Sequence, residues 1–513
     1  MYASRSDGQL YKATEVPSKA LAFHRSAGAE EGPSSSQQGQ ANDLQDLAWM
    51  YQYRGDLTHA RDSLKEALSL HSAIGDRLGE ANVLRSLGEL IYRQDDYDNA
   101  EAYLNDALSL YHAINERLGG ANTLQSLGDI HLLREDFTDA EISLKNALFL
   151  HQAVQDRIGE TNDLTFLGEI YMNLDRNDDA ETALNQALEY HKASGSQKGE
   201  ANDLQNLAWI YQYRGDLRRA MDHLEEALSL HRAIEDRKGE ARALGSLGDL
   251  FYREDDLEEA EKSLIDALSL YRAINHCLGE ANVLQSLGDV YCRKNYFYKA
   301  ERTYKKAASL HHSLQDRTGE ATDHQSLAIM YFQKGNLDKA EASSCTALDL
   351  FATIHNRFGQ ANSLQGLGKV YLYREDLSKA EESLKNALSL HQAVQARTGL
   401  AVDLALLGEI YMKSDRNAEA EKVLHDAVDL YRTIHMPLGE GNALQILGKV
   451  YTKMARFDEA EAILTRALEL HQAIEWAKGS IGNDEWALEE LLQAREASAR
   501  DREVSTPTGH PLL

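Results

Sequence analysis

A forty-residue sequence repeat covers most of the chain without an insertion or deletion. Its most regular mark is a glycine at residues Gly39, Gly79, Gly119, Gly159, Gly199, Gly239, Gly279, Gly319, Gly359, Gly399, Gly439 and Gly479. Eleven complete units therefore occupy residues 39–478. Repetition of this length is typical of solenoids, in which each unit packs mainly against its neighbours. A chain of 513 residues built from unrelated domains would not keep this register.

Each unit has the pattern of two helices joined by a short polar turn. In the unit 79–118 the apolar residues recur at steps of three and four, at Leu84, Leu87, Ile91, Ala100, Leu104 and Ala107. This spacing predicts two amphipathic helices, here called helix A and helix B. Asp96 in the turn is expected to cap the start of helix B. The repeated glycine is expected at the end of helix B, in a left-handed conformation.

Positions that correspond in successive units are here called columns, and each column is named by one of its residues. Small residues in three columns predict close contact between the helices. Alanine fills the Ala100 and Ala107 columns in all eleven units, and the Gly88 column holds only Gly or Ala. A larger side chain there would overpack the contact by roughly 1–3 kcal/mol. A single hairpin cannot cover its own apolar face, so the units must stack. The sequence predicts an all-α solenoid, a curved superhelix with a concave and a convex side.

The two ends differ from the repeats. Residues 1–38 predict a partial helix around 9–28 followed by a polar linker that extends to residue 41. Residues 479–500 predict one capping helix, with Leu488, Leu491 and Leu492 on its apolar side, and residues 501–513 are expected to be disordered. The predicted domains are thus 1–38, 39–478, 479–500 and 501–513.

The composition excludes several classes of function. The net charge of −28 repels nucleic acid and anionic lipid and favours basic partners. No stretch reaches the ~20 apolar residues needed to cross a bilayer, so no membrane association is expected. Cys277, Cys292 and Cys345 have no metal-binding spacing and fit a reducing compartment. These features predict a cytoplasmic protein.

No motif in the sequence indicates catalysis, a cofactor or a metal. One column of helix B holds His71, His151, His191, His231, His311, His391 and His471. Packed helices lie ~8–10 Å apart, so these imidazoles cannot share an ion that needs bonds of ~2 Å, and a packing or capping role is expected. Residues 441–449 lack the spacing and the Ser or Thr of a phosphate-binding loop. The chain is predicted not to be an enzyme.

The columns Leu84, Gly88, Ile91, Ala100 and Ala107 resemble the tetratricopeptide repeat signature over about 440 residues. Leu or His replaces the signature Trp in the Leu84 column, and the unit has forty residues rather than 34. Lengthened units of this kind are similar to the arrays of kinesin light chains, spindle-orientation adaptors, and fungal and bacterial signalling proteins. The resemblance implies a right-handed α-solenoid with adaptor function. The chaperone-type carboxylate clamp is absent, because Arg85 alone supplies one of its cations.

The resemblance also implies that helix A lines the concave groove. Three of its columns are then the candidate peptide-binding site. The amide columns supply Asn82, Asn122, Asn162, Asn202, Asn282, Asn362, Asn442, Gln125, Gln205, Gln285 and Gln365. The third column supplies Asp129, Glu169, Trp209, Asp249 and Asp289, and turns basic at Lys369 and Lys449. Amides can bind the backbone of an extended peptide, and the acidic column favours basic and apolar residues in it. The alternative is that the amides bridge neighbouring helices and that the acidic column is a solvated face.

The sequence therefore predicts an interaction scaffold whose partners are proteins with extended basic and apolar segments. One alternative is the ligand-sensing half of a signalling or NTPase-linked system, and another is a structural spacer without a groove ligand. Self-association of the solenoid is left open by the sequence.

Overall fold

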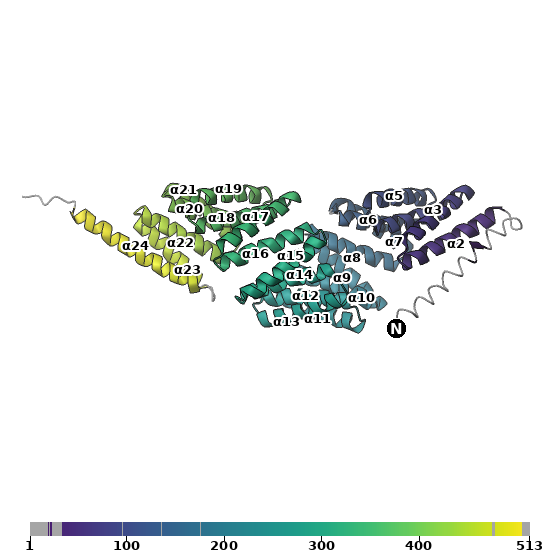
Figure 1. Cartoon of the computed structure of the whole chain (residues 1–513), viewed down its shortest axis with the longest axis horizontal. Helices are drawn as coiled ribbons and strands as arrows, with labels where there is room; N and C mark the ends of the chain where they lie inside the picture. Colours follow the sequence, from purple (N-terminus) through teal and green to yellow (C-terminus); the bar gives the residue numbers. More distant parts are fainter. Residues whose placement is uncertain are drawn as a thin grey trace, which may run out of the picture. The chain divides into compact units, whose positions relative to one another are not determined.

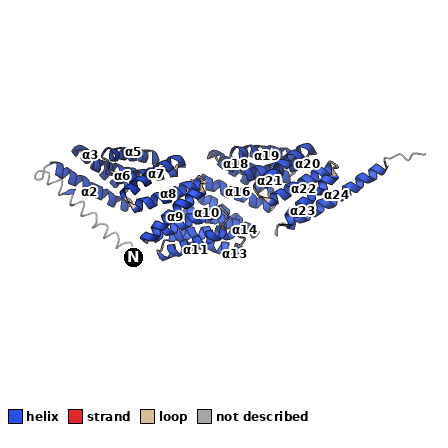
Figure 2. Cartoon of the chain, turned by 180° about the vertical axis from the view of Figure 1, so that it is seen from behind, coloured by secondary structure: helices blue, strands red, loops and turns tan. Residues whose placement is uncertain are grey.

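The computed structural model describes residues 19, 21–22, 33–94, 96–134, 136–174, 176–473 and 478–504, and every regular element in these ranges is an α-helix (Figures 1 and 2). The chain divides into two compact units, Met1–Ser246 and Leu247–Leu513.

The first unit holds α2 (Pro33–Tyr53), α3 (Leu57–Ile74), α4 (Arg77–Tyr92), α5 (Tyr97–Ala113), α6 (Arg117–Leu133), α7 (Phe137–Val154), α8 (Arg157–Asn173), α9 (Asn177–Ser194), α10 (Gln197–Tyr213) and α11 (Leu217–Ala233). Helix α12 (Arg237–Arg253) contributes residues to both units. The second unit holds α13 (Leu257–Ala273), α14 (Cys277–Arg293), α15 (Phe297–Ser313), α16 (Arg317–Gln333), α17 (Leu337–Thr353), α18 (Arg357–Tyr373), α19 (Leu377–Ala393), α20 (Arg397–Lys413), α21 (Asn417–Thr433), α22 (Pro437–Lys453), α23 (Phe457–Gln472) and α24 (Lys478–Val504).

Within each unit the helices form a stack of antiparallel hairpins. Even-numbered helices are the predicted helices A and odd-numbered helices are the predicted helices B. From α2 to α11 and from α13 to α24 each helix packs on the next one, and helices A also contact one another, as in α4 with α6 and α16 with α18. This is the predicted all-α solenoid of helix hairpins, and the prediction is confirmed.

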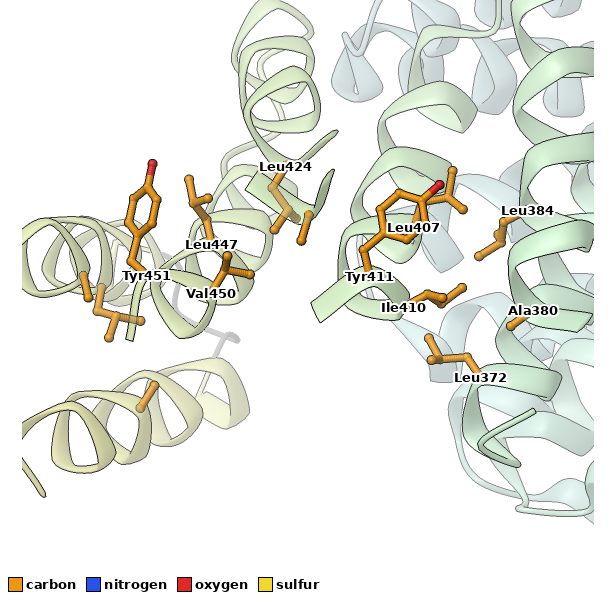
Figure 3. Close-up of a cluster of buried hydrophobic side chains, with 14 of the residues drawn as sticks. Leu372, Ala380, Leu384, Leu407, Ile410, Tyr411, Leu424, Leu447, Val450 and Tyr451 are labelled. Carbon is orange, nitrogen blue, oxygen red and sulfur yellow. The ribbon is translucent and has the colours of Figure 1, made fainter. Parts of the chain in front are cut away.

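The core repeats the same contact from hairpin to hairpin. In the second unit, Leu384 and Leu424 of helices B are fully buried beside Leu407 and Leu447 of helices A (Figure 3). Helix A approaches helix B most closely at its small residue, because a Cβ added at Gly128 would lie 2.6 Å from the Leu144 side chain. Only hydrogen fits at Gly128 at this helix spacing, and no unit has a residue larger than Ala in the column.

The predicted caps of helix B are present in most hairpins. Asp56, Asp96, Asp216, Asp256, Asn336 and Asp376 each accept a hydrogen bond from the backbone N–H three residues later. Asp136 makes no such bond. A side-chain acceptor at this position satisfies one of the free N–H groups at the helix start, typically worth ~1 kcal/mol.

The expected role of the repeated glycine was wrong. Helix B ends four residues earlier, at left-handed residues such as Gly75 and Asn275. The repeated glycine lies in the first turn of helix A, where the N–H of Gly79 donates to the Asp76 carboxylate. It is small because the ring at the end of helix B lies against its Cα: a Cβ added at Gly399 would be 2.5 Å from His391.

The predicted polar linker is helical from Pro33 onward, so that part of the prediction was wrong. Proline is tolerated in the first turn of a helix, and the Ser and Gln residues that follow are compatible with helix once Ala41 and Leu44 are buried. At the other end, α24 occupies the place of the expected capping helix and buries Ala487 and Leu491. Leu492, expected on the same side, is 57% exposed. The tail was expected to be disordered from residue 501, but α24 continues to Val504, so the expected boundary was wrong. The expected partial helix at 9–28 and the residues beyond 504 fall almost entirely outside the described residues.

Candidate functional site

The candidate site is the surface that the predicted amide and acidic columns form on helices A, here called the A face. In α6 these positions are Asn122, Gln125 and Asp129, and all three are half-buried. Trp209 of α10 is 42% exposed and stacks on Tyr213, with 5.6 Å between ring centroids. Trp49 of α2, in the same column, is 66% exposed and stacks on Tyr53 in the same way, with 6.0 Å between ring centroids. The A face thus presents polar groups and two aromatic platforms to solvent within the first unit.

Four asparagines of the A face contact helix B of their own hairpin, and a fifth, Asn202, contacts the next helix A. Asn122, Asn282 and Asn362 lie within 3.0–3.2 Å of the Nε2 atoms of His151, His311 and His391. Asn82 accepts from the Tyr111 hydroxyl at 2.6 Å, and Asn202 accepts from Arg242 at 2.8 Å. These bonds use Oδ1 only. Asn162, Asn282 and Asn442 are exposed.

The glutamines of the A face reach the next helix A. Gln125 donates to Asp163 at 2.8 Å, and Gln365 donates to Asp403 at 2.7 Å. Gln205 donates to the carbonyl of Gly239 at 3.1 Å, and Gln285 is half-buried. The amides therefore bridge neighbouring helices, as the alternative interpretation expected, while Nδ2 donors of the asparagines that contact histidine or tyrosine stay unused within the described ranges.

A buried His–Asp pair joins successive hairpins, and sequence reasoning missed it. The Nδ1 atom of the helix B histidine lies 2.5–2.7 Å from the carboxylate in the next helix, in His151–Asp163, His191–Asp203, His311–Asp323, His391–Asp403 and His471–Asp484. Burial raises the pKa of Asp163 and Asp203, and raises that of Asp323 to about 6. Although burial opposes protonation of His311, the Asp323 carboxylate raises its pKa.

The sequence carries a signal for these pairs. Where helix B ends in Tyr111, Tyr271, Phe351 or Tyr431, the residue twelve positions later is Thr123, Val283, Ser363 or Ala443 and never Asp. His71 and His231 also lack the aspartate, and His71 pairs with Asp76 at 3.0 Å instead. The histidines are therefore internal packing residues, and no cluster of metal ligands occurs in the described part of the chain.

A second set of carboxylates lies at the turns and is neutralised within the protein. Each belongs to helix B and pairs with Arg or Lys of the next hairpin, as in Glu101–Arg134, Glu141–Arg176, Glu181–Arg214, Glu261–Lys294, Glu301–Lys339, Glu341–Arg374, Glu381–Arg416, Glu421–Arg456 and Glu461–Arg495. These pairs are here called the turn ladder.

The carboxylates of the A face have neutral partners instead. Asp129 accepts from the Tyr92 hydroxyl at 2.6 Å, Glu169 from Asn206 at 3.3 Å, and Asp289 from the Tyr304 hydroxyl at 2.6 Å. Asp249 is bonded to Ser286. Among the described residues, no Lys or Arg forms an ion pair with any of these four, which are the acidic residues predicted for the site. Glu89 and Glu409, in the same column, pair with Arg85 and Lys413 of their own helices.

Burial perturbs the ionisation of this surface. It raises the pKa of Glu169 and Asp249, and it raises the pKa of Asp289 to about 6. Because the folded chain holds the Asp289 proton more tightly than the unfolded chain, its contribution to stability is present below pH ~4 and is lost as the pH rises through 6.

Asp289→Asn should therefore raise the denaturant midpoint of the protein at pH 7 and leave it unchanged at pH 4. The substitution keeps an acceptor for Tyr304 and removes the buried charge. Urea unfolding followed by circular dichroism at the two pH values measures this difference. Equal effects at both would mean that Asp289 ionises normally.

Comparison with known proteins identifies the family. The tetratricopeptide repeat profile matches residues 79–150, 161–233, 239–311, 320–393 and 401–473, and a second profile of the same repeat matches residues 44–74. The chain therefore belongs to the tetratricopeptide repeat proteins, a class of helical repeats that supports protein–protein interaction. The search of curated proteins found no match to the chain.

Solved structures share the fold at low sequence identity. A Signal Transduction ATPase with Numerous Domains (STAND) protein with a tetratricopeptide repeat sensor, from Pyrococcus horikoshii, aligns with a TM-score of 0.52 and 18% identity over 72% of this chain and 54% of its own. Yeast Tom70 aligns with a TM-score of 0.44 and 13% identity over 91% and 99%. BtubC (BKLC) from P. vanneervenii aligns with a TM-score of 0.37 and 22% identity over 42% and 91%. No described helix is long and apolar enough to span a bilayer.

Proposed function

We propose that the chain is a non-catalytic, cytoplasmic adaptor whose A face binds extended, basic segments of partner proteins. The observation that carries this proposal is the contrast between the two sets of carboxylates. Those of the turn ladder are paired with Arg or Lys of the chain. In the described residues, Asp129, Glu169, Asp249 and Asp289 form no ion pair and accept hydrogen bonds from neutral groups, and the charges of Arg242 and Arg253 only partly offset the rise that burial causes in the pKa of Glu169 and Asp249. A partly buried carboxylate without a cation gains most from a lysine or arginine brought by a ligand.

The neighbouring groups suit a peptide backbone. Unused Nδ2 donors of Asn122 and Asn282 lie on the same helices as Asp129 and Asp289 and can donate to carbonyl groups of an extended segment. Trp209 with Tyr213 offers a platform for an aromatic or apolar anchor.

Binding of a 15-residue Lys- and Arg-rich peptide with one Trp should be weakened about tenfold or more by the double substitution Asp249→Asn and Asp289→Asn, since it removes two charge-assisted contacts. The matched control is Glu341→Gln with Glu381→Gln, which changes the net charge equally but acts on the turn ladder. Fluorescence anisotropy at 0.15 M salt measures both. If both double variants lost the same affinity for the peptide, the change in net charge alone would explain the loss, and the proposed site on the A face would be wrong.

The same binding should depend on pH. Because burial raises the pKa of Asp289 to about 6, the free protein carries a growing fraction of neutral carboxyl as the pH falls from 7 to 5. Affinity for the basic peptide should therefore rise between pH 5 and 7 and then level off, and Asp289→Asn should flatten the profile. An unchanged profile in this variant would exclude Asp289 from the contact.

The second candidate is the sensor half of a signalling system. It is supported by the likeness to the STAND protein with its tetratricopeptide repeat sensor, which covers most of this chain. Affinity purification with intact protein distinguishes the two: a recurrent partner that carries a nucleotide-binding domain favours the sensor, and partners that share only a basic segment favour the adaptor.

A further inference from the structure

Two residues break the repeat inside the core of the second unit, and only one of them is smaller than the residue it replaces. The helix B column that begins with Leu64 holds Leu in nine of eleven units, Tyr304 in one and Ser344 in another. Serine is much smaller than leucine, so α17 leaves space where the other hairpins are filled. The facing residue on α18 is Gly366, the only glycine in its column, and a Cβ added there would be 3.4 Å from the Ser344 hydroxyl.

The space is a cavity of about 470 Å³ between α16, α17 and α18. Its apolar wall is formed by Ala328, Ile329, Phe332 and Val370, and Ser344 lies at its base. The Phe332 ring is held edge-on against Tyr373, with 5.8 Å between centroids. Cavities that bind small molecules are typically 300–1,000 Å³ and largely apolar, with a few placed polar groups, and this cavity has that size and that construction.

The polar groups of the cavity are amides and one cation. Gln325, Asn362 and Gln365 line it beside Lys369, and none of its lining residues is acidic. Gln365 and Asn362 are fixed by their bonds to Asp403 and His391. Lys369 makes neither an ion pair nor a hydrogen bond within the described residues. Burial lowers the pKa of its amine, and the charge of Asp403, whose carboxylate already accepts from Gln365 and lies against His391, opposes this only in part. An anion entering the cavity would supply the partner that Lys369 lacks.

We infer that this cavity is a binding site for a small amphipathic anion, an aryl or alkyl carboxylate whose apolar body fills the space over Ser344 and whose carboxylate pairs with Lys369. The basic segments proposed for the rest of the A face do not suit it, because Lys369 repels a cation. The anion site is therefore separate from the proposed peptide-binding site, and the inference does not depend on peptide binding.

The test measures binding of 4-phenylbutyrate to the full chain, with 4-phenylbutan-1-ol as the uncharged control ligand. Binding is measured by isothermal calorimetry and by saturation-transfer NMR. The acid should bind about tenfold or more tightly than the alcohol. Ser344→Leu, which restores the residue of the other hairpins, should abolish binding of both while keeping or raising the thermal midpoint. Lys369→Met should remove the preference for the acid, and Lys449→Met, in the same column but packed over Trp486, should not.

Three results would overturn the inference. Equal binding of acid and alcohol to the wild-type chain would remove the role of Lys369. Undiminished binding to Ser344→Leu would place the ligand elsewhere. The third result is that the free acid does not bind, whereas a peptide with adjacent Phe and Glu binds the wild-type chain and not Ser344→Leu. The cavity would then be a binding site for a peptide side chain. Because the basic peptide is assayed with Asp249 and Asp289 variants, failure of either proposal leaves the other standing.

Discussion

Replacing His151 by Tyr should destabilise the first unit by about 3–5 kcal/mol, the usual cost of removing one partner of a buried ionic pair. Asp163 would remain fully buried, and Gln125 would be its one remaining hydrogen-bond donor among the residues that the structure describes. The loss should shrink toward pH 5, because burial already raises the pKa of Asp163 and a neutral carboxyl needs no imidazole.

The preceding hairpin indicates which second substitution should restore the lost stability. It carries Tyr111 and Thr123 at the equivalent positions, and the Tyr111 hydroxyl reaches Asn82 as His151 reaches Asn122. The double variant His151→Tyr with Asp163→Thr should therefore recover most of the lost stability. Hydrogen exchange of the amides in α6, α7 and α8 measures the local free energy of opening in each variant. If Asp163→Thr restores nothing, the pair is not the source of the loss.

Replacing Gly399 by Ala should cost about 1–3 kcal/mol through overpacking, although alanine is the better helix former by ~1 kcal/mol. The added Cβ would lie 2.5 Å from the His391 ring. That ring cannot move aside easily, because its two nitrogens lie within hydrogen-bond distance of Asp403 and Asn362. Urea unfolding followed by circular dichroism should show an early phase from the second unit.

The control for this prediction is Gly482→Ala in α24. No heavy atom lies within 4 Å of its added Cβ, so helix propensity alone should act and the variant should be slightly more stable. A Gly399→Ala protein as stable as this control would mean that the first turn of helix A shifts freely, and the repeated glycine would then need another explanation.

The architecture was predictable because the repeat imposes one local solution eleven times. The spacing of Leu84, Leu87 and Ile91 defined helix A, and the cap at Asp96 defined where helix B starts. The repeated glycine was misplaced because a helix end and a close contact both select glycine. Only the structure distinguishes them, since the left-handed position is held by Asn275 and Gln315 as well as by Gly75.

The candidate site was predictable as a surface but not as a set of contacts. The columns placed Asn122, Gln125 and Asp129 together on one face. Which groups bond inward depends on packing between hairpins, so the partners of the amides could not be read from one helix. The sequence does carry signals for the rest: the His–Asp pairs show as two columns that vary together, and the cavity shows as the one unit with Ser344 in place of a large residue.

The His–Asp pairs also define which segment can be exchanged between positions of the array. A segment cut at the repeated glycine, such as 159–198, carries the aspartate of one pair and the histidine of the next. A segment cut at the turn before helix B, such as 136–175, carries His151 and Asp163 together. Duplication or grafting with the second boundary keeps every buried carboxylate with its own imidazole. The segment of this solenoid that can be duplicated or grafted as a unit is thus helix B with the helix A that follows it.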